Sequence, residues 1–333
     1  MTDTRAPHAP RPTPHGLTPS RPTKIAVTGG TGFIGRHLVA TLAGRGHEVT
    51  VVARRGAAVP GAARVIEADV ADRGVAAALA GAGAIVHLAG LADASLSARD
   101  PVGYTTVNAL GTLNVLEAAR AGGARAGVVF ASSQRVYEPW HGPLGEDSPT
   151  GPTTVYGWGK LAAEGFVQMY ARLYGVPTVT LRLFTVYGPG QRMTGGVSGV
   201  VAIFGERALA GRELLVHGRH LRDFVYVTDV VAAVERALAR LRDPAVAGRV
   251  YNIGTGVATA LDDLARLVRA RVVAAGGPEA PVRVAEPGER PEHAVATIAR
   301  ARRELGYAPA VVLEDGVERY LAWLRGEIGE RSG

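Results

Sequence analysis

Apolar runs with the length of strands alternate with amphipathic segments along the first half of the chain. The runs are rich in Val, Ile, Leu and Ala and predict buried strands. They lie at 24–28, 47–52, 64–67, 84–88, 127–132 and 178–183. Between them, apolar residues three or four positions apart predict helices near 33–45, 73–81, 101–122 and 153–174. Strands and helices in this alternation predict a doubly wound α/β fold, in which helices cover both faces of a parallel sheet.

The pattern loosens after about residue 185. Gly- and Pro-rich turns and short strands follow, with helices predicted near 197–211, 228–242, 260–275 and 299–306. We expect a dinucleotide-binding domain over residues 23–185 and a smaller α/β substrate lobe over residues 186–328, partly interleaved with the first. Residues 1–22, rich in Pro, Thr, His and Arg without periodicity, are predicted to be a disordered tail.

The composition is that of an ordinary globular protein, with 47% hydrophobic and 20% charged residues. The formal net charge is +7, but the basic residues are spread along the chain, so we do not expect nucleic-acid binding. The absence of cysteine excludes disulfides and cysteine metal sites and is typical of a cytoplasmic protein. No apolar run is long enough for a membrane span, and no metal site is predicted. Lysine occurs only at Lys24 and Lys160.

Three glycines, Gly29, Gly32 and Gly35, follow the first strand with the spacing G-x-x-G-x-x-G. Such a turn allows the backbone to approach a pyrophosphate and lets the next helix pack closely on the sheet. That helix directs its free N–H groups and positive dipole end at the phosphates. We therefore predict a dinucleotide site at this turn, to which Phe33 and Ile34 also contribute.

Two arginines end the second strand and bear on which dinucleotide binds. NAD sites usually place an acidic side chain here, whereas NADP sites place arginine against the 2′-phosphate. Arg54 and Arg55 favour NADP(H), with NAD(H) still possible and solvated loop charges as the alternative. Asp69, at the end of the third strand, is placed to meet the adenine or to be an ordinary surface carboxylate.

A tyrosine and a lysine lie four residues apart near the start of the helix predicted at 153–174. This spacing puts Tyr156 and Lys160 on one helix face, about 6 Å apart between Cβ atoms. A nearby ammonium lowers the pKa of a tyrosine, which can then exchange a proton with a carbinol oxygen while a nicotinamide carries hydride. Ser132 and Ser133 end a buried strand at the edge where such sheets bind ligands. We predict Ser133, Tyr156 and Lys160 as catalytic residues and Ser132 as a neighbouring substrate contact; turn-forming serines are the alternative.

Further motifs extend over residues 24–325. They are Thr28–Gly35, His87-Leu88-Ala89, Asn108 with Gly111-Thr112-Leu113-Asn114, Ser132–Tyr137, Tyr156 with Lys160, Leu181-Arg182-Leu183, Val186-Tyr187-Gly188-Pro189, Arg222–Val227 and Tyr251–Gly254. In this combination the chain resembles the extended short-chain dehydrogenase/reductase family of nucleotide-sugar epimerases, dehydratases and reductases. The resemblance implies a Rossmann sheet that binds the dinucleotide and a C-terminal lobe that binds the sugar nucleotide.

The resemblance also implies roles for single residues. Leu88 and Ala89 would line the cofactor, and Lys160 would also hold the nicotinamide ribose. Arg222 and Arg290 would clamp the substrate diphosphate, a role that suits the two-pronged guanidinium group. Solvent-exposed arginine is the alternative at both positions.

The chain departs from the family pattern in two places that bear on the reaction. Gln134 and Arg135 stand where the dehydratase branch has an acidic pair, so we reject 4,6-dehydration. Thr185 stands where many members have an asparagine near the substrate diphosphate, and we keep it as a candidate substrate contact.

Three functions then remain, and the arginines after the second strand favour the first. It is NADPH-dependent reduction of a nucleotide-linked 4-keto-6-deoxyhexose. The second is 4-epimerisation of a nucleotide-linked hexose with retained NAD, and the third is a cofactor-binding sensor without catalysis. The helices predicted at 101–122 and 153–174 carry wide apolar stripes, which predict a homodimer through a four-helix interface.

Overall fold

The computed structural model describes residues 23–122, 126–139, 142–192, 199–218, 220–285 and 293–332. The tail predicted at 1–22 and the candidate substrate ligand Arg290 lie outside the described residues.

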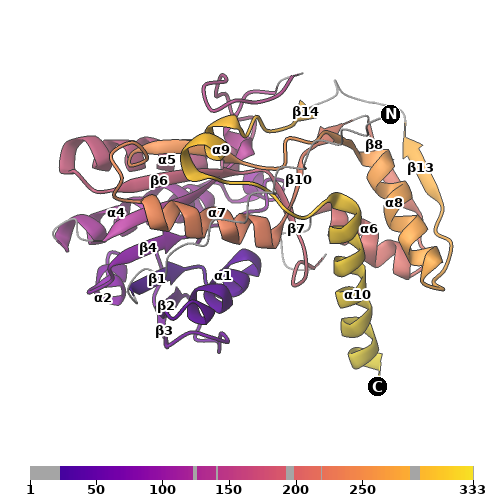
Figure 1. Ribbon diagram of the computed structural model, residues 1–333, viewed down its shortest axis with the longest axis horizontal. Helices are drawn as coiled ribbons and strands as arrows, with labels where there is room; N and C mark the ends of the chain where they lie inside the picture. The colour runs from indigo at the N-terminus through magenta and orange to yellow at the C-terminus, as the bar shows by residue number, and fades with distance from the viewer. Residues whose placement is uncertain are drawn as a thin grey trace, which may run out of the picture.

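A seven-stranded sheet forms the larger part of the molecule (Figure 1). Its strands, in the order in which they lie side by side, are β3 (Arg64–Glu67), β2 (Glu48–Ala53), β1 (Lys24–Thr28), β4 (Ala84–His87), β5 (Gly127–Ser133), β6 (Thr178–Leu183) and β11 (Arg249–Ile253). Every neighbouring pair is parallel. The chain runs outward from β1 to one edge and then crosses back to build the other half. The doubly wound parallel sheet predicted from the sequence is thereby confirmed.

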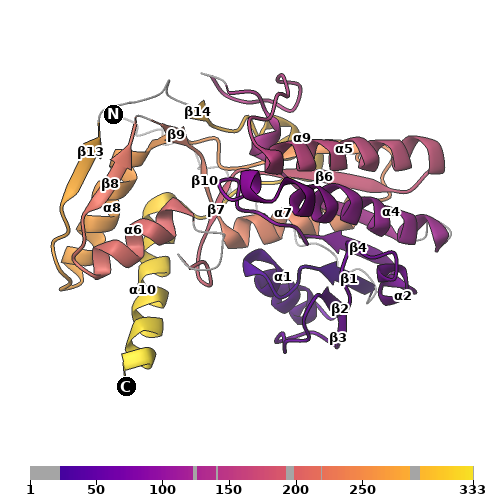
Figure 2. The same cartoon turned by 180° about the vertical axis from the view of Figure 1, so that it is seen from behind.

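Helices cover both faces of this sheet (Figures 1 and 2). One layer holds α1 (Phe33–Gly44), α7 (Val227–Arg240) and α9 (Ala299–Leu305). The opposite layer holds α2 (Val75–Leu79), α4 (Gly111–Ala121) and α5 (Val155–Tyr174). Alternate side chains of β1 pack against opposite helix layers. Ile25 and Val27 belong to the apolar core under the first layer, and Ala26 belongs to the core under the second.

The helix predicted at 101–122 is interrupted. After the short turn η1 (Ser97–Arg99) come α3 (Pro101–Thr105), a π-helical turn η2 (Thr106–Leu110) and α4. At Asn108 in the π turn, the side-chain amide donates to the Leu91 carbonyl over 2.9 Å and its oxygen accepts the Leu91 N–H over 2.8 Å. Gly111 begins α4 where a Cβ atom would lie 2.9 Å from the side chain of Val70. Such widened turns recur at functional sites.

The second part of the molecule is smaller and has its own apolar core. Its elements are β7 (Thr185–Tyr187), α6 (Val200–Leu209), β8 (Leu214–His217), β9 (Leu221–Arg222), β10 (Phe224–Tyr226), β12 (Thr259–Ala260), α8 (Leu261–Ala274), β13 (Val282–Ala285), β14 (His293–Ala294) and α10 (Leu313–Ser332). The sequence analysis did not predict α10. Its Val317, Tyr320, Leu321 and Leu324 pack into this core beside α6 and α8.

The chain passes between the two parts more than once. Although α7 and β11 follow residue 186, α7 packs against α1 and β11 pairs in register with β6. The large sheet is therefore completed by a strand from the second half of the chain. Within the described residues, no helix has both the length and the apolar run that crossing a membrane requires.

Candidate active site

The glycine-rich turn is fixed between two strands of the sheet. The Gly29 N–H donates to the Val52 carbonyl at the end of β2 over 3.1 Å. Gly29 has φ of +73°, and a Cβ atom there would lie 2.7 Å from the backbone nitrogen of Ala89, after β4. A Cβ atom on Gly35 would lie 2.7 Å from the Cα atom of Gly30. Only glycine permits this approach of the turn to the sheet.

The same turn leaves the start of α1 open to an anion. Gly32 caps the helix without a side-chain hydrogen bond, so the first N–H groups, beginning at Phe33 and Ile34, have no side-chain acceptor from the cap. Leu88 and Ala89 pass directly beside the turn, because the Leu88 N–H donates to the Thr28 carbonyl over 3.1 Å. These residues fit a dinucleotide pyrophosphate, since bare backbone and a helix N-terminus face the same place; their contact with the cofactor stays a prediction.

The three predicted catalytic residues lie together at the carboxyl end of β5. Thr154 caps α5 by accepting the Gly157 N–H over 3.1 Å, which brings Tyr156 into the first turn. The side chains of Tyr156 and Ser133 are both buried, and Ser133 lies close enough to act on the ionisation of the Tyr156 hydroxyl. One helical turn further, the Lys160 ammonium donates to the Ala131 carbonyl over 2.8 Å and lies 4.9 Å from the centre of the Phe130 ring.

Burial dominates the protonation of this group. It raises the pKa of Tyr156, while the hydrogen bond from Ser133 and the positive charge of Arg135 oppose the rise. This differs from the expected lowering of the Tyr156 pKa by Lys160, because spacing along a helix does not reveal desolvation. Burial also lowers the pKa of Lys160 to about 8, and the negative charge of Glu164 opposes that lowering.

A relay of buried polar groups, which the sequence analysis noted only as motif residues, connects the turn to the π-helical segment. The Ala89 N–H donates to the Thr28 hydroxyl, which lies 2.7 Å from His87 Nδ1. His87 Nε2 lies 3.0 Å from the Thr112 hydroxyl, which in turn donates to the Asn108 carbonyl over 2.7 Å. This order of donors gives His87 the tautomer protonated at Nε2. Burial lowers the pKa of His87 to about 3, so the ring is neutral at physiological pH.

The residues predicted to contact the adenosine half lie around the end of β2 and β3. Arg54 and Arg55 are exposed directly after β2. A third arginine, which the sequence analysis missed, lies on α1: Arg36 Nε donates to the Thr31 carbonyl of the glycine-rich turn over 2.9 Å. The Asp69 carboxylate accepts the Ala71 N–H over 2.9 Å and so stabilises its own turn; its contact with adenine stays a prediction.

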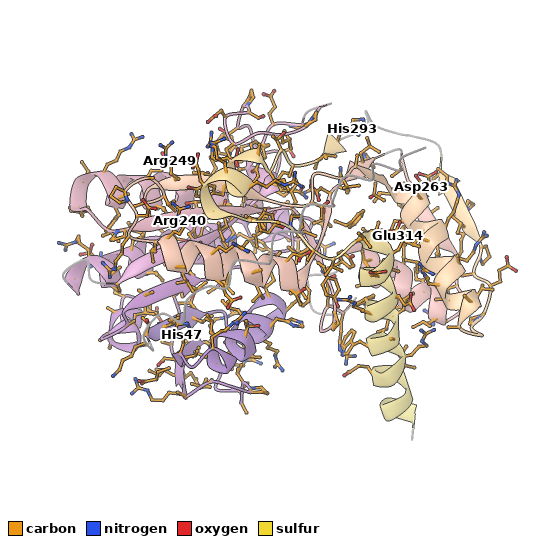
Figure 3. The ribbon with its side chains drawn as sticks, in the orientation of Figure 1. His47, Arg240, Arg249, Asp263, His293 and Glu314 are labelled. Atoms are coloured by element: carbon orange, nitrogen blue, oxygen red, sulfur yellow. The ribbon has the colours of Figure 1, made fainter. Side chains whose placement is uncertain are left out.

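A small cleft lies next to Gln134 and Arg135, which follow Ser133 in the chain. Its walls come from η3 (Gln134–Val136), the chain on either side of it and the second part of the molecule. The lining residues are Gln134, Arg135, Tyr137, Glu138, Pro139, Leu144, Thr153, Arg222, His293 and Ala294. Arg222, predicted to bind the substrate diphosphate, thus shares a cleft with residues that follow Ser133. Figure 3 shows His293 of β14 where the two parts of the molecule meet.

Two other predicted substrate contacts have intramolecular partners. The Thr185 hydroxyl accepts a hydrogen bond from the Gln134 amide over 3.3 Å, at the margin of the cleft. The Ser132 hydroxyl donates to the buried carboxylate of Glu164. The geometry therefore does not support Ser132 as a substrate contact, because successive residues of a strand point to opposite faces and only Ser133 meets Tyr156.

Comparisons with known proteins agree with this geometry. The profile described as the NAD dependent epimerase/dehydratase family matches residues 25–254. A curated relative, the UDP-glucose 4-epimerase of Mycolicibacterium smegmatis, is 35% identical over 317 residues, which cover 91% of this chain and 98% of the relative. The solved UDP-glucose 4-epimerase of Thermotoga maritima with UDP-glucose has a TM-score of 0.82 at 31% identity, covering 92% of this chain and 99% of that one.

A second solved structure, MoeE5 in complex with UDP-glucuronic acid and NAD, has a TM-score of 0.81 at 31% identity and covers 91% of this chain and 99% of its own. The match to the family profile spans both the glycine-rich turn and the tyrosine–lysine pair. This chain belongs to the NAD-dependent epimerase/dehydratase family, as the resemblance to the extended short-chain dehydrogenases/reductases implied.

Proposed function

We propose that this protein interconverts the C4 epimers of a nucleotide-diphosphate hexose through transient oxidation at C4, with NAD retained between the two half-reactions. The observation that carries the proposal is the buried group of Ser133 and Tyr156 at the end of β5, with Lys160 one helical turn further along α5. The sequence alone favoured a reductase. The relatives move the preference to the epimerase, since the Mycolicibacterium and Thermotoga proteins are UDP-glucose 4-epimerases and MoeE5 was solved with NAD.

The chemistry asked of the side chains is proton transfer at one oxygen. Tyr156 accepts the proton of the C4 hydroxyl, and Ser133 donates a hydrogen bond to the same oxygen as it becomes a carbonyl. Ser133 and Arg135 favour the ionised form of Tyr156, and Lys160 places a positive charge one helical turn away. A bound NAD would supply the hydride chemistry at C4. In the second half-reaction Tyr156 gives the proton back to O4, on whichever face the sugar presents.

An epimerase must also hold the diphosphate while the keto sugar rotates. Arg222, which lines the cleft together with Gln134 and Arg135, supplies a guanidinium group for this anchor. Because Gln134 and Arg135 replace the acidic pair of the dehydratase branch, elimination of water lacks its acid and base. Epimerisation needs no acid–base group at those two positions.

A second candidate is favoured by one specific observation. Ala53 ends β2 where NAD sites usually have an acidic side chain, and the exposed Arg54 and Arg55 follow it. Arg36 of α1 donates to the Thr31 carbonyl of the glycine-rich turn. These arginines suit a 2′-phosphate and support NADPH-dependent reduction of a nucleotide-linked 4-keto-6-deoxyhexose.

One experiment separates the two candidates. The purified protein is denatured, the released nucleotide is identified, and native protein is assayed with UDP-glucose, UDP-galactose and UDP-glucuronic acid without added cofactor. Near-stoichiometric NAD with interconversion of C4 epimers is the expected result. Protein without bound nucleotide that oxidises NADPH in the presence of a 4-keto sugar nucleotide would replace the epimerase by the reductase. Tight cofactor binding without turnover of any sugar nucleotide would indicate a sensor.

A further inference from the structure

A buried ion pair lies directly behind the catalytic group. Glu164 of α5 and Arg182 of β6 have side chains that are only 2% and 6% exposed. Arg182 donates from Nη2 to Glu164 Oε2 over 2.7 Å and from Nε to Glu164 Oε1 over 2.9 Å. This two-pronged geometry satisfies both carboxylate oxygens and fixes their orientation.

The carboxylate also reaches the strand that carries the catalytic serine. Ser132 donates its hydroxyl hydrogen to Glu164 Oε1. Ser132 precedes Ser133, so the same carboxylate holds the end of β5 at which Ser133 meets Tyr156. Along α5, Tyr156, Lys160 and Glu164 follow one another at intervals of four residues and lie on one face.

The arginine extends this network to the wall of the substrate cleft. Arg182 Nη1 donates to the Glu146 carbonyl over 3.0 Å, and its guanidinium carbon lies 4.7 Å from the centre of the Tyr137 ring. The Tyr137 hydroxyl donates to Asn252 Oδ1 over 2.6 Å, and Asn252 Nδ2 donates to the Leu144 carbonyl over 2.8 Å. Tyr137 and Leu144 both line the cleft.

A buried ion pair is a poor source of stability, because the loss of hydration of two charges offsets most of their attraction. Apolar side chains of similar volume would fill this place between α5 and β6 as well. What an apolar pair would not provide is a fixed acceptor for Ser132 and a negative charge one helical turn behind Lys160. The arrangement therefore fits a role in the site better than a role in stability.

We propose that Glu164 is a positioning residue for the C4 reaction, which holds the end of β5 through Ser132 and keeps Lys160 positively charged through its own charge. The inference rests on the proposed function only for the identity of the reaction. Burial lowers the pKa of Lys160 and the charge of Glu164 opposes this, with a net pKa of about 8. Removing the negative charge therefore lowers the pKa of Lys160 further and moves the alkaline limit of activity to lower pH.

Few other charges act on Lys160. The titratable and charged groups that face it or its two neighbours on the helix are Tyr156, Glu164, His87 of β4, Arg182 of β6, Arg135 of η3 and Tyr104 of α3. His87 is neutral over the pH range in which Lys160 titrates, because the pKa of His87 is lowered to about 3. Tyr156 and Tyr104 have pKa values raised by burial, and both arginines stay charged. Glu164 is thus the group whose substitution changes the charge around Lys160.

The chain allows a direct measurement, because Lys24 and Lys160 are its only lysines. In protein labelled with 13C at the lysine Cε atoms, NMR titration follows both ammonium groups with no substrate present. In Glu164→Gln we expect the Lys160 pKa to fall by about half a unit or more while that of the exposed Lys24 stays unchanged. Glu117→Gln is the matched control, since Glu117 accepts a hydrogen bond from Tyr170 of the same helix but lies away from the site.

The activity assay adds the second half of the test. Ser132→Ala leaves the ion pair in place, so we expect kcat to fall with little change in KM and no change in the Lys160 titration. An unchanged Lys160 pKa in Glu164→Gln, or an unchanged kcat in Ser132→Ala, would overturn the proposal. If Glu164→Gln does not fold, two other variants still test the proposal. These are Ser132→Ala and Glu164→Asp, and the second keeps the negative charge and should keep the Lys160 pKa. If the protein does not interconvert C4 epimers but the Lys160 pKa falls as expected in Glu164→Gln, the proposed function alone is refuted.

Discussion

At the residue scale, the site combines a tyrosine whose phenol is buried with two groups that favour its ionisation. Ser133 and the positive charge of Arg135 both lower the pKa of Tyr156 against the rise caused by burial. Lys160 is held by the β5 backbone rather than by Tyr156. Catalytic proton transfer therefore depends on a short list of side chains, and each has a separable contribution.

Tyr156→Phe removes the group that exchanges the proton and leaves the ring in its packed position. We expect turnover to fall by about 10²- to 10⁴-fold, the usual contribution of a positioned acid–base group. The dissociation constant for the cofactor should stay nearly unchanged. Steady-state kinetics with cofactor titration by fluorescence checks both, with Tyr174→Phe on the exposed part of the same helix as control. Near-normal turnover would refute the assigned chemistry.

A second residue-scale prediction concerns the arginines after β2. If they bind a 2′-phosphate, Arg54→Ala, Arg55→Ala and Arg36→Ala should each weaken NADPH binding by roughly ten- to a hundredfold, the value of one charge-assisted hydrogen bond. NADH binding should change little, because it has no phosphate there. Calorimetry with both nucleotides measures the ratio, and the exposed Arg64→Ala at the start of β3 is the control. If the ratio of the dissociation constants for NADPH and NADH is the same in all three variants as in the wild-type protein, these arginines do not contact the cofactor.

At the element scale, buried polar contacts join the strands and helices around the site. The His87 relay connects β1, β4 and α4, and the Glu164–Arg182 pair connects α5 to β6. The π turn at Asn108 lies between them and binds the segment after β4 through Leu91. Each of these contacts joins elements that are distant in the sequence, so they hold the sheet edge as one unit.

Acid should destabilise the fold through His87. The unfolded chain binds a proton at this histidine below a pH of about 6.5, whereas the folded protein keeps the ring neutral down to about 3. Stability therefore falls as the pH drops through this window, by about 2 kcal/mol between pH 6.5 and pH 5.

Urea unfolding at pH 7 and pH 5 measures this effect. His87→Gln keeps hydrogen-bonding capacity but cannot be protonated, so its stability should depend less on pH by that amount. His217→Gln, at an exposed position, should keep the wild-type dependence. Equal pH dependence in all three proteins would contradict the assignment of a buried neutral His87.

Sequence patterns reveal the elements in which apolar and polar residues follow one regular pattern without interruption. The strands at 64–67 and 178–183 were predicted with the observed bounds, and Tyr156 and Lys160 were found because their spacing is local. In contrast, α10 was missed, since charged residues and glycines interrupt its apolar positions. The pKa of Tyr156, the partner of Ser132 and the His87 relay depend on burial and on contacts between distant segments, which periodicity does not encode.

At the scale of the whole molecule, the cleft lies where the second part meets the carboxyl edge of the sheet. Arg222 and His293 reach it from the second part, while Gln134 and Arg135 reach it from the end of β5. The helix layer that contains α4 and α5 leaves apolar side chains exposed. They include Trp158, Leu173 and Tyr174 of α5 and Leu110 before α4. Such a surface on a two-helix layer suits pairing with a second copy.

We predict a homodimer through α4 and α5. Sedimentation at micromolar concentration should give a dimer for the wild-type protein and a monomer for Leu173→Glu combined with Trp158→Glu, because charges at the centre of an apolar interface oppose association. Val257→Glu, at an equally exposed apolar residue in the second part, should leave the dimer intact. A wild-type monomer, or a dimer that survives the double substitution, would refute this interface.

The place of β11 also governs how this protein is made. β6 is buried along its whole length between β5 and β11, yet its second neighbour is supplied only after the chain has built β7 to β10 and α7. During synthesis on the ribosome, an apolar strand therefore waits with one edge unpaired, the condition that promotes association between nascent chains. A fragment that ends after β6 would keep that edge of β6 open, whereas in the whole chain β11 covers it.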